Sequence, residues 1–456
     1  MPANATKSTV AIIGGGLAGL AAGCALAEDG YHVRLFERRP YLGGRASSYQ
    51  HPGTGEVVDN CQHVLLGCCT NLINLYRRSG VESKVRWFDR LHFLEPGGRD
   101  SVIALTSLPA PLHTSPSFLL SKALNLQDKI GIARAMLKMR KEVPDDGSSF
   151  LDWLKGNRQT ERSIRRFWAP VLVSALNEDL DRCSTRYAAQ VFRESFLKSS
   201  TAGRMGIPAI PLSDLYSAAG EYIRQRGGEV NLRSSVENIR PESNAVRFCA
   251  AGAEIYADMA VLAAPFNVVA NLLPQDDDSR PLRRQIGCFE SSPITGIHLW
   301  FDRQITDLEH AVLLDRTIQW MFHKSKLLNR SGDGSYVELV VSSSKSLVEM
   351  GRQEIIDLAV RELGDFFPIV KQAKLEKATV IKEVHATYSP QPGIDQYRPS
   401  SRSPWPRLFL AGDWTQTNWP ATMEGAVRSG YLAAESIAGK KFVVPDLPAT
   451  GLMRFL

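Results

Sequence analysis

Thr9-Val-Ala-Ile-Ile-Gly14-Gly-Gly-Leu-Ala-Gly19 is the stretch that decides the fold of this 456-residue chain. Its first five residues are mostly β-branched and apolar, which predicts a short buried parallel strand. The alanine-rich segment Leu17–Asp29 predicts a helix, and His32–Phe36 predicts a second strand that ends in the acid Glu37. The order strand, GxGxxG, helix, strand and acid predicts a dinucleotide-binding unit of an α/β fold.

Each glycine of this motif has a separate physical task. Gly14 makes the tight turn, Gly16 lets the backbone approach a pyrophosphate, and Gly19 lets the helix pack closely on the strand. The helix then begins at Leu17 and Ala18, where free N–H groups and partial positive charge face the phosphates. We therefore expect all five residues to contact the dinucleotide.

The acid and the residues after it extend the predicted site. Glu37 lies eighteen residues beyond the last glycine, where it can accept hydrogen bonds from a ribose diol. Arg38 follows at once, and Gly43-Gly44-Arg45 comes a few residues later. The two glycines can wrap the pyrophosphate from its other side, with Arg45 as a charge-assisted donor.

This extended signature resembles the flavin amine oxidase and phytoene desaturase superfamily, in which the Gly-Gly-Arg element marks FAD rather than NAD. The C-terminal part matches as well, because a predicted strand from Arg407 runs into Gly412-Asp413 and a predicted helix spans 421–437. The resemblance implies that Gly412 and Asp413 hold the ribityl and phosphate portion of FAD. It also implies that the helix points Thr422 and Met423 at the flavin, where a helix N-terminus stabilises negative charge.

The two matching chain ends predict a Rossmann-like FAD-binding domain interrupted by a mixed α+β substrate domain. We expect the FAD-binding domain to comprise 1–85, 207–265 and 396–440, and the substrate domain to comprise 86–206 and 266–395. In similar proteins the residue at the position of Val236 contacts adenine through its backbone. Within the substrate domain we expect the first part to be mainly helical. The second part predicts strands at 296–301, 318–323 and 336–342 and a helix at 346–363.

The stretch Val58-Asp59-Asn-Cys61-Gln62-His63-Val-Leu-Leu-Gly67 narrows the resemblance. It is similar to the segment Asp-Asn-Gly-Gln-His-Val-Leu-Leu-Gly of hydroxysqualene dehydroxylases, also called squalene-associated FAD-dependent desaturases. The segments 76–80, 411–415 and 420–430 fit the same family. Cys61 stands where glycine is expected, and Asn418-Trp419 replaces an expected Gly-Leu, so local pocket shape is in question.

The resemblance implies reduction of hydroxysqualene, a C30 isoprenoid, to squalene on the route to hopanoids. Reduced FAD would donate the hydride, and an unidentified electron donor would reduce the FAD. Because hydroxide is a poor leaving group, an acid must protonate it. Gln62 and His63 would lie beside the flavin, so His63 is our first candidate acid, with His385 as its rival and a purely structural role equally open. Asp59 would orient His63 or hold a backbone turn.

Several alternatives stay open at this stage. Aromatic residues could shield a cationic intermediate, and the candidates are Phe167, Trp168, Trp300, Trp320, Tyr388 and Trp419. A related FAD-dependent carotenoid or phytoene-type desaturase, or an amine oxidase, would instead remove hydride from its substrate. The third alternative is a non-catalytic, FAD-stabilised lipid-binding protein.

Composition and charge limit the remaining classes. The chain has 54 Lys and Arg against 48 Asp and Glu, and these charges are scattered, which predicts no nucleic-acid binding. The seven cysteines form no CxxC pair, so we expect a reducing compartment and no metal site. No transmembrane span is predicted. The basic-flanked apolar stretch from Thr106 through Phe118 to Lys141 predicts a cytoplasmic protein in peripheral contact with the inner face of the cell membrane, although a helix packed on the substrate domain would give the same pattern.

Overall fold

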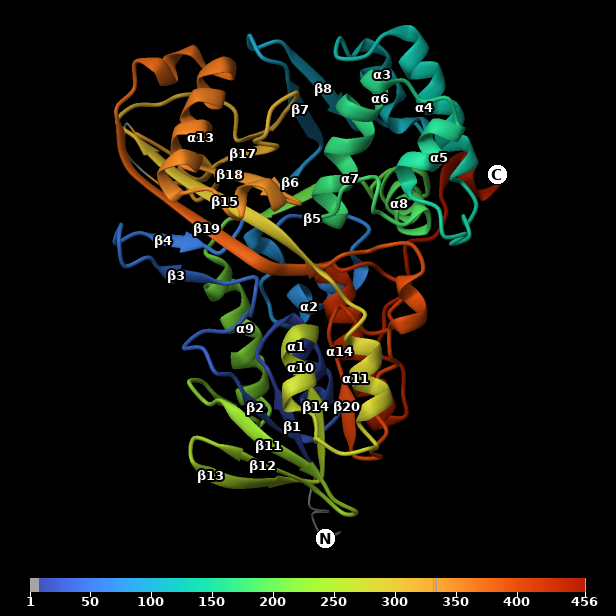
Figure 1. Cartoon of the computed structure of the whole chain (residues 1–456), viewed down its shortest axis with the longest axis vertical. Coiled ribbons are helices and arrows are strands. Elements are labelled where there is room, and N and C mark those ends of the chain that lie inside the picture. Colours follow the sequence, from blue (N-terminus) through green and yellow to red (C-terminus); the bar gives the residue numbers. More distant parts are fainter. Residues whose placement is uncertain (1–7, 331, 333, 456) are drawn as a thin grey trace.

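A computed structural model describes residues 8–330, 332 and 334–455. Two regions follow one another along the long axis of the molecule, each built around its own β-sheet (Figure 1). We call them the parallel-sheet region and the mixed-sheet region. In the part of the chain described, no helix combines the length and apolar character needed to cross a bilayer.

The parallel sheet has the strand order β10-β2-β1-β14-β20, and all its pairs are parallel. Its strands come from distant parts of the chain: β1 (Thr9–Ile13), β2 (His32–Phe36), β10 (Glu229–Asn231), β14 (Met259–Leu262) and β20 (Leu408–Leu410). Strand β1 is almost completely buried, as expected for a strand covered on both faces. The predicted α/β fold is confirmed.

Three helices pack on this sheet: α1 (Leu17–Glu28), α9 (Leu212–Gln225) and α14 (Met423–Ala438). Close approach depends on glycine. A Cβ on Gly19 would lie 1.9 Å from the carbonyl oxygen of Gly14, and one on Gly430 would lie 2.1 Å from that of Ala18. Helices α1 and α14 therefore touch backbone to backbone, which brings the two ends of the chain together.

The mixed sheet has the order β19-β15-β18-β17-β16-β7-β8. Its strands are β7 (Arg90–Leu94), β8 (Asp100–Ala104), β15 (Ser291–Phe301), β16 (His310–Leu313), β17 (Trp320–His323), β18 (Ser335–Ser342) and β19 (Leu375–Tyr388). The odd-numbered residues of β15 and β18, such as Ile297 and Leu339, form an apolar core with α13 (Arg352–Phe366). The even-numbered residues face the other way, toward the parallel-sheet region.

A helical layer covers one end of the mixed-sheet region (Figure 1). It contains α3 (Ser115–Leu120), α4 (Leu126–Lys138), α5 (Phe150–Gly156), α6 (Glu161–Ser163), η3 (Ile164–Trp168), α7 (Ala169–Leu176), α8 (Thr185–Phe192) and η4 (Arg193–Leu197). Trp168 and Phe192 pack edge to face in its core, 4.8 Å apart.

The remaining elements connect these layers. The strands are β3 (Ser48–Gln50), β4 (Val57–Asp59), β5 (Leu65–Leu66), β6 (Val85–Phe88), β9 (Met205–Pro208), β11 (Val236–Pro241), β12 (Val246–Ala250) and β13 (Ala253–Ala257). The helices are α2 (Thr70–Arg78), α10 (Phe266–Leu272), α11 (Arg280–Ile286) and α12 (Lys324–Leu327). Short 3-10 turns are η1 (Glu82–Lys84), η2 (Leu112–Thr114), η5 (Lys345–Leu347), η6 (Pro368–Lys371), η7 (Ile394–Tyr397) and η8 (Gly451–Arg454).

The mixed-sheet region departs from expectation at several places, and the short strand β16 at His310–Leu313 is one of them. The 14-residue strand β19 was not predicted, because its charged residues hide the pattern of an edge strand that pairs only with β15. Strands β7 and β8 lie in a part expected to be mainly helical. The helix expected at 346–363 begins at Arg352, because η5 precedes it and the N–H of Gly351 is capped by Glu354.

Candidate active site

The two glycine motifs of the first 45 residues lie against each other. The N–H of Gly43 donates to the carbonyl of Gly15 (2.9 Å), and Gly16 and Gly43 form a parallel bridge. A Cβ on Gly44 would lie 3.0 Å from the Cα of Gly16. Both motifs therefore line one space through their backbones, as the wrapping of a pyrophosphate from two sides requires.

The acid at the end of β2 closes this space. Glu37 is buried; its Oε2 accepts from the N–H of Gly15 (2.7 Å) and its Oε1 from that of Arg39 (2.8 Å). The N–H of Ser234 donates to the Glu37 carbonyl (2.8 Å), which brings the start of β11 at Val236 beside the acid. The residues predicted for ribose and adenine are thus neighbours in space.

The two arginines that follow Glu37 lie in different surroundings. Arg38 is exposed, whereas Arg39 donates from Nη1 to the carbonyl of Gly44 (2.8 Å). Alternate residues of an extended chain point to opposite sides, so Arg39 shares the side of Glu37. Arg38 was predicted as a cofactor-binding residue and Arg39 was not. The alternation of side chains along an extended chain after Glu37 could have indicated Arg39.

The C-terminal half of the predicted cofactor site meets the N-terminal half through an ion pair. Nη2 of Arg45 lies 2.9 Å from Oδ1 of Asp413, and its Nη1 donates to the carbonyl of Ala386 (2.6 Å). Gly412 has a φ of +153°, and a Cβ there would lie 2.2 Å from Nε1 of Trp414. Arg45 and Asp413 are therefore close enough to share one ligand.

Helix α14 presents its N-terminus to the same region. It begins at Met423, two residues later than predicted, because the Thr422 hydroxyl caps the helix and accepts from the N–H of Gly425 (3.1 Å). The Tyr216 hydroxyl donates to Sδ of Met423 (3.5 Å). The capped helix end carries the partial positive charge that an electron-rich ring would favour.

These residues fit FAD. Glycines that a Cβ would fill provide the backbone cradle, and among the described residues no side chain caps the N-terminus of α1 at Gly16. Glu37 supplies acceptors at one end of the cradle and Asp413 at the other. The predicted cofactor residues are Gly14, Gly16, Leu17, Ala18, Gly19, Glu37, Arg38, Gly43, Gly44, Arg45, Gln62, His63, Val236, Gly412, Asp413, Thr422 and Met423. Arg38 is exposed, and the loop that carries Gln62 and His63 is tied to the cradle by Asn60, whose Nδ2 donates to the carbonyl of Arg45 (3.2 Å).

The Asp59–His63 loop leaves β4 and lies against the mixed sheet. A Cβ on Gly296 of β15 would lie 3.5 Å from the carbonyl oxygen of Asn60 and 3.9 Å from the Cα of Cys61. Asp59 is buried, and its Oδ2 accepts from Nζ of Lys324 (2.6 Å). Burial opposes the ionisation of Asp59, but the Lys324 ammonium outweighs it and holds the pKa of Asp59 below its usual value.

The geometry of His63 limits its use as an acid. Its Nδ1 lies 2.7 Å from the carbonyl oxygen of Cys61, so Nδ1 carries the proton and Nε2 is an acceptor. Burial lowers the pKa of His63, which is therefore neutral at neutral pH. The expected orientation by Asp59 is wrong, because Asp59 bonds to Lys324, Ser48 and the backbone N–H of Leu212. Holding a backbone turn, its alternative role, fits these contacts.

The other predicted pocket residues are dispersed. The rival acid His385 is exposed and pairs with the hydroxyl of Ser291 (2.7 Å). The aromatic candidates belong to separate clusters: Phe167, Trp168 and Tyr388 in or against the largest core, Trp300 stacked on Tyr336, Trp320 beside Phe322, and Trp419 beneath Arg428. The expected aromatic shield is therefore not assembled from these six residues.

Three residues near the loop were missed by sequence reasoning. Lys324 donates from Nζ to Oε1 of Gln62 (2.8 Å) and lies 3.5 Å from Oε2 of Glu338, which stands opposite His298 across β15 and β18. All three side chains are almost fully buried. Glu338 is a single acid in the middle of the apolar run Tyr336–Ser342, and this pattern could have indicated a buried carboxyl group.

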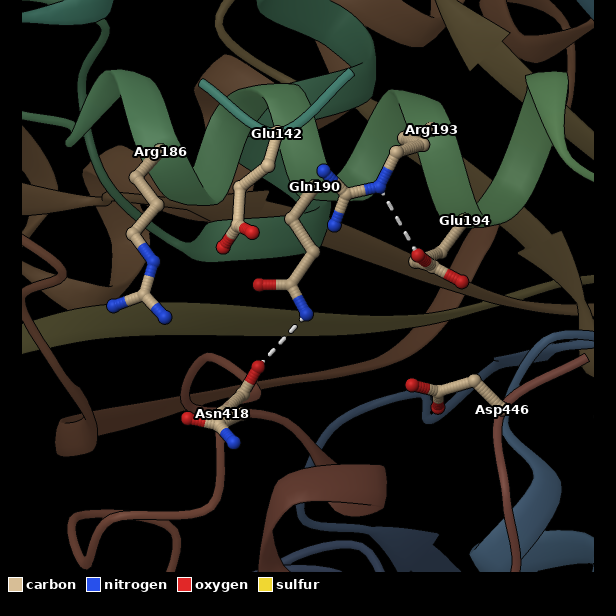
Figure 2. Close-up of a pocket in the computed structure, with 7 residues that line it drawn as sticks. All are labelled: Glu142, Arg186, Gln190, Arg193, Glu194, Asn418 and Asp446. Carbon is tan, nitrogen blue, oxygen red and sulfur yellow. Dashed lines mark hydrogen bonds and ion pairs between the residues drawn. The ribbon is translucent and has the colours of Figure 1, made fainter. Parts of the chain in front are cut away.

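A pocket opens between helix α8 and the loop that carries Asn418 (Figure 2). Gln190 donates from Nε2 to the carbonyl of Asn418 (2.8 Å), and Nε of Arg193 pairs with Glu194 (3.2 Å). Glu142, Arg186 and Asp446 complete the lining. Because charged and amide groups dominate it, this pocket is unsuited to an apolar chain.

A parallel βαβ unit with a double glycine cradle, completed by the C-terminal Gly-Asp and helix, defines a dinucleotide-binding flavoprotein. The chain belongs to the family of flavin-containing amine oxidoreductases, whose family model matches residues 17–438. It is an FAD-dependent oxidoreductase, as predicted.

The chain is similar to carotenoid desaturases over nearly its whole length. The 15-cis-phytoene desaturase of Synechococcus elongatus is 28% identical and covers 95% of this chain and 96% of its own length. The zeta-carotene desaturase of Synechocystis sp. is 27% identical, with 94% and 96% covered. These names support the desaturase alternative more directly than hydroxysqualene reduction.

Solved structures show the same fold. An oxidoreductase from Methanosarcina mazei superposes with a TM-score of 0.73 at 19% identity, covering 95% of this chain and all of the other. Wild-type putrescine oxidase bound to putrescine gives a TM-score of 0.71 at 16% identity, with 95% and 99% covered.

Proposed function

We propose that this flavoenzyme acts on a long isoprenoid chain and reductively removes the hydroxyl of hydroxysqualene to give squalene. The observation that carries the proposal is the Asp59–His63 loop, whose sequence resembles that of the dehydroxylases. The loop lies between the cofactor cradle and Gly296 on β15, the strand next to the edge strand β19 of the mixed sheet, where a substrate would meet the flavin. The division into 1–85, 207–265 and 396–440 for FAD and 86–206 and 266–395 for substrate is part of this proposal.

The second candidate is desaturation of a carotenoid precursor, which the names of the relatives favour. The two reactions share an apolar isoprenoid substrate and differ in the direction of hydride transfer. An amine oxidase has less support, because the aromatic candidates lie in separate clusters rather than in one cage. A non-catalytic lipid-binding role has the least support, because the cradle for FAD is intact.

Bound FAD in its reduced form supplies the hydride. In this reaction a new C–H bond would replace the C–O bond, and one proton would be needed to convert the departing hydroxide into water. The chain must therefore hold the cofactor, exclude water and supply that proton. Neutral His63 offers an acceptor at Nε2, which favours another group as the source of the proton.

A single-turnover experiment separates the candidates. Protein photoreduced under anaerobic conditions is mixed with hydroxysqualene, and we expect flavin reoxidation together with one squalene per FAD. In the matched control, oxidised protein is mixed with phytoene. Flavin reduction by phytoene, with no reoxidation by hydroxysqualene, would replace the proposed reaction by desaturation.

An exposed apolar surface supports peripheral contact with a membrane. The segment 108–112, helix α3, helix α4 and the chain at η8 carry it, and η8 is tied to this end by the N–H of Leu452, which donates to the carbonyl of Ala110 (2.9 Å). Its members are Leu108, Leu112, Leu119, Leu120, Leu126, Ile130, Leu137, Leu452 and Phe455, and we call them the apolar end. Phe118 is partly buried against Phe167 rather than fully exposed.

Cations border the apolar end. Lys138 and Lys141 are exposed and, with Leu137 and Arg140, line a shallow pocket at the end of α4. Apolar side chains flanked by Lys and Arg favour insertion into the interface of an anionic bilayer. A membrane docked here would deliver a water-insoluble substrate, which is consistent with the proposed function.

A further inference from the structure

The inner face of the mixed sheet carries unpartnered polar atoms directly behind the Asp59–His63 loop. His298 and Glu338 are paired opposite each other in the antiparallel ladder of β15 and β18, and both are completely buried. Within the described residues, Nε2 of His298 and both carboxyl oxygens of Glu338 have no hydrogen-bond partner. Opposed side chains in such a ladder have Cβ atoms about 4.5–5.5 Å apart, so His298 and Glu338 are neighbours on the inner face.

The groups around Glu338 come from four elements. Lys324 of α12 and Asp59 of β4 form a buried ion pair, and Nζ of Lys324 lies 3.5 Å from Oε2 of Glu338. His298 of β15 is hydrogen-bonded through Nδ1 to the hydroxyl of Tyr336 on β18 (2.8 Å). The thiol of Cys61 in the loop is also buried, and burial raises its pKa well above the usual value. One cation therefore faces two carboxyl groups.

Charge balance decides which carboxyl group is ionised. Asp59 has the shorter contact with Lys324 and accepts further hydrogen bonds from Ser48 and Leu212, which favour its charged form. Glu338 has the longer contact with Lys324 (3.5 Å), and burial raises its pKa to about 8 although Lys324 and the backbone of Gln62 oppose this shift. Burial lowers the pKa of His298 to about 3. At neutral pH, Glu338 therefore holds a proton and His298 is neutral.

We propose that Glu338 is the proton store of the active site, held behind the loop beside the Lys324 ammonium. This inference rests on the proposed function for the use of the proton. The O–H bond of Glu338 breaks, the proton goes to the departing hydroxide, and the electron pair of the C–O bond leaves with the oxygen as water. Lys324 stabilises the resulting Glu338 carboxylate, which regains a proton from solvent.

The first test needs bound FAD and no substrate. Infrared spectra of the holoenzyme, recorded across a pH series, should contain the C=O stretch of a protonated carboxylic acid that disappears near pH 8. The Glu338→Gln variant should lack this band, and Glu338→Asp should restore it. The matched control is Glu362→Gln, which alters a buried carboxyl group on α13, across the opposite face of the sheet. Absence of the band from the wild type, or its survival in Glu338→Gln, overturns the proposal.

The second test uses single-turnover reoxidation by hydroxysqualene. Glu338→Gln should bind FAD normally and react about 10²–10⁴-fold more slowly, the contribution of a positioned acid. The wild-type rate should fall above pH 8, and the variant should lose this dependence. An unchanged rate and pH profile in Glu338→Gln overturns the proposal. If hydroxysqualene fails to react while the infrared band is present, the proposed function alone is wrong.

Discussion

The cofactor cradle and the inner face of the mixed sheet are built in opposite ways. The cradle uses backbone: its first glycines lie within two short stretches of sequence, and a Cβ on Gly14, Gly19 or Gly43 would lie 1.9–2.4 Å from a carbonyl oxygen. The inner face uses side chains from Asp59, His298, Lys324 and Glu338, which are far apart in sequence and share one set of charges. FAD binding thus depends on glycines that have no side chain, whereas the proposed proton transfer depends on charged and titratable side chains.

The largest effect is expected at the inner face. Lys324→Met leaves Asp59 buried without its cation, which should lower the free energy of unfolding by about 3–5 kcal/mol. Because the pKa of Asp59 is lowered in the folded protein, this ion pair stabilises the fold above the ordinary carboxyl pKa and is lost as the pH falls through the lowered value. The deficit of the variant should therefore shrink on acidification.

Urea unfolding of the holoenzyme between neutral and acidic pH measures this effect. Lys326→Met is the matched control, because Lys326 pairs with the almost fully exposed Asp307 and should contribute about 0–1 kcal/mol. Equal losses in the two variants would show that the buried cluster is no more important than a surface ion pair.

The next effect tests the cradle. Gly19→Ala places a Cβ 1.9 Å from the carbonyl oxygen of Gly14, so the turn and the helix must separate at a cost of about 1–3 kcal/mol. FAD content and thermal unfolding are the measurements. Gly156→Ala is the control, because a Cβ there meets no atom within 4 Å. If Gly19→Ala retained FAD like the control, close backbone packing would not be what shapes the cradle.

A comparable effect is expected at the acid of the cradle. Glu37→Ala removes the acceptor for the N–H groups of Gly15 and Arg39 and for the predicted ribose hydroxyls. FAD affinity should weaken by about 1–3 kcal/mol, measured by flavin fluorescence on titration of the apoprotein. Arg38→Ala changes an exposed side chain and serves as the comparison. A larger loss in Arg38→Ala would reverse the assignment.

The smallest effect on the protein itself is expected at the apolar end. Leu120 and Leu126 are 80% and 70% exposed, so changing both to Ser should alter stability by no more than about 0.5 kcal/mol each. Affinity for anionic vesicles, measured by flotation, should nevertheless fall by at least about 100-fold, since the two leucines together contribute about 3–6 kcal/mol, and high salt should weaken binding of the wild type. Tyr256→Ser, on β13 at the opposite end of the molecule, is the control (Figure 1). Flotation that is equal in both variants would place the membrane contact elsewhere.

Contiguous motifs explain what could be predicted. The first strand and helix, the second strand and the α14 region were expected within two residues of where they lie, because turn glycines and helix caps act through near neighbours. Long strands of the mixed sheet were also recognised from apolar runs. Strand β19 was missed because an edge strand satisfies its pairing on one side only and tolerates charged residues.

The sequence by itself determined the class of the protein: a dinucleotide cradle, its extension to FAD and the loop that suggests the substrate. Tertiary structure alone decided the protonation states. Asp59 is far in sequence from Lys324 and Glu338. Nothing in the neighbouring sequence indicates that Asp59 is ionised and that Glu338 is neutral. Burial and the distance to a single ammonium decide that difference, because the energy of a charge depends on what surrounds it in space.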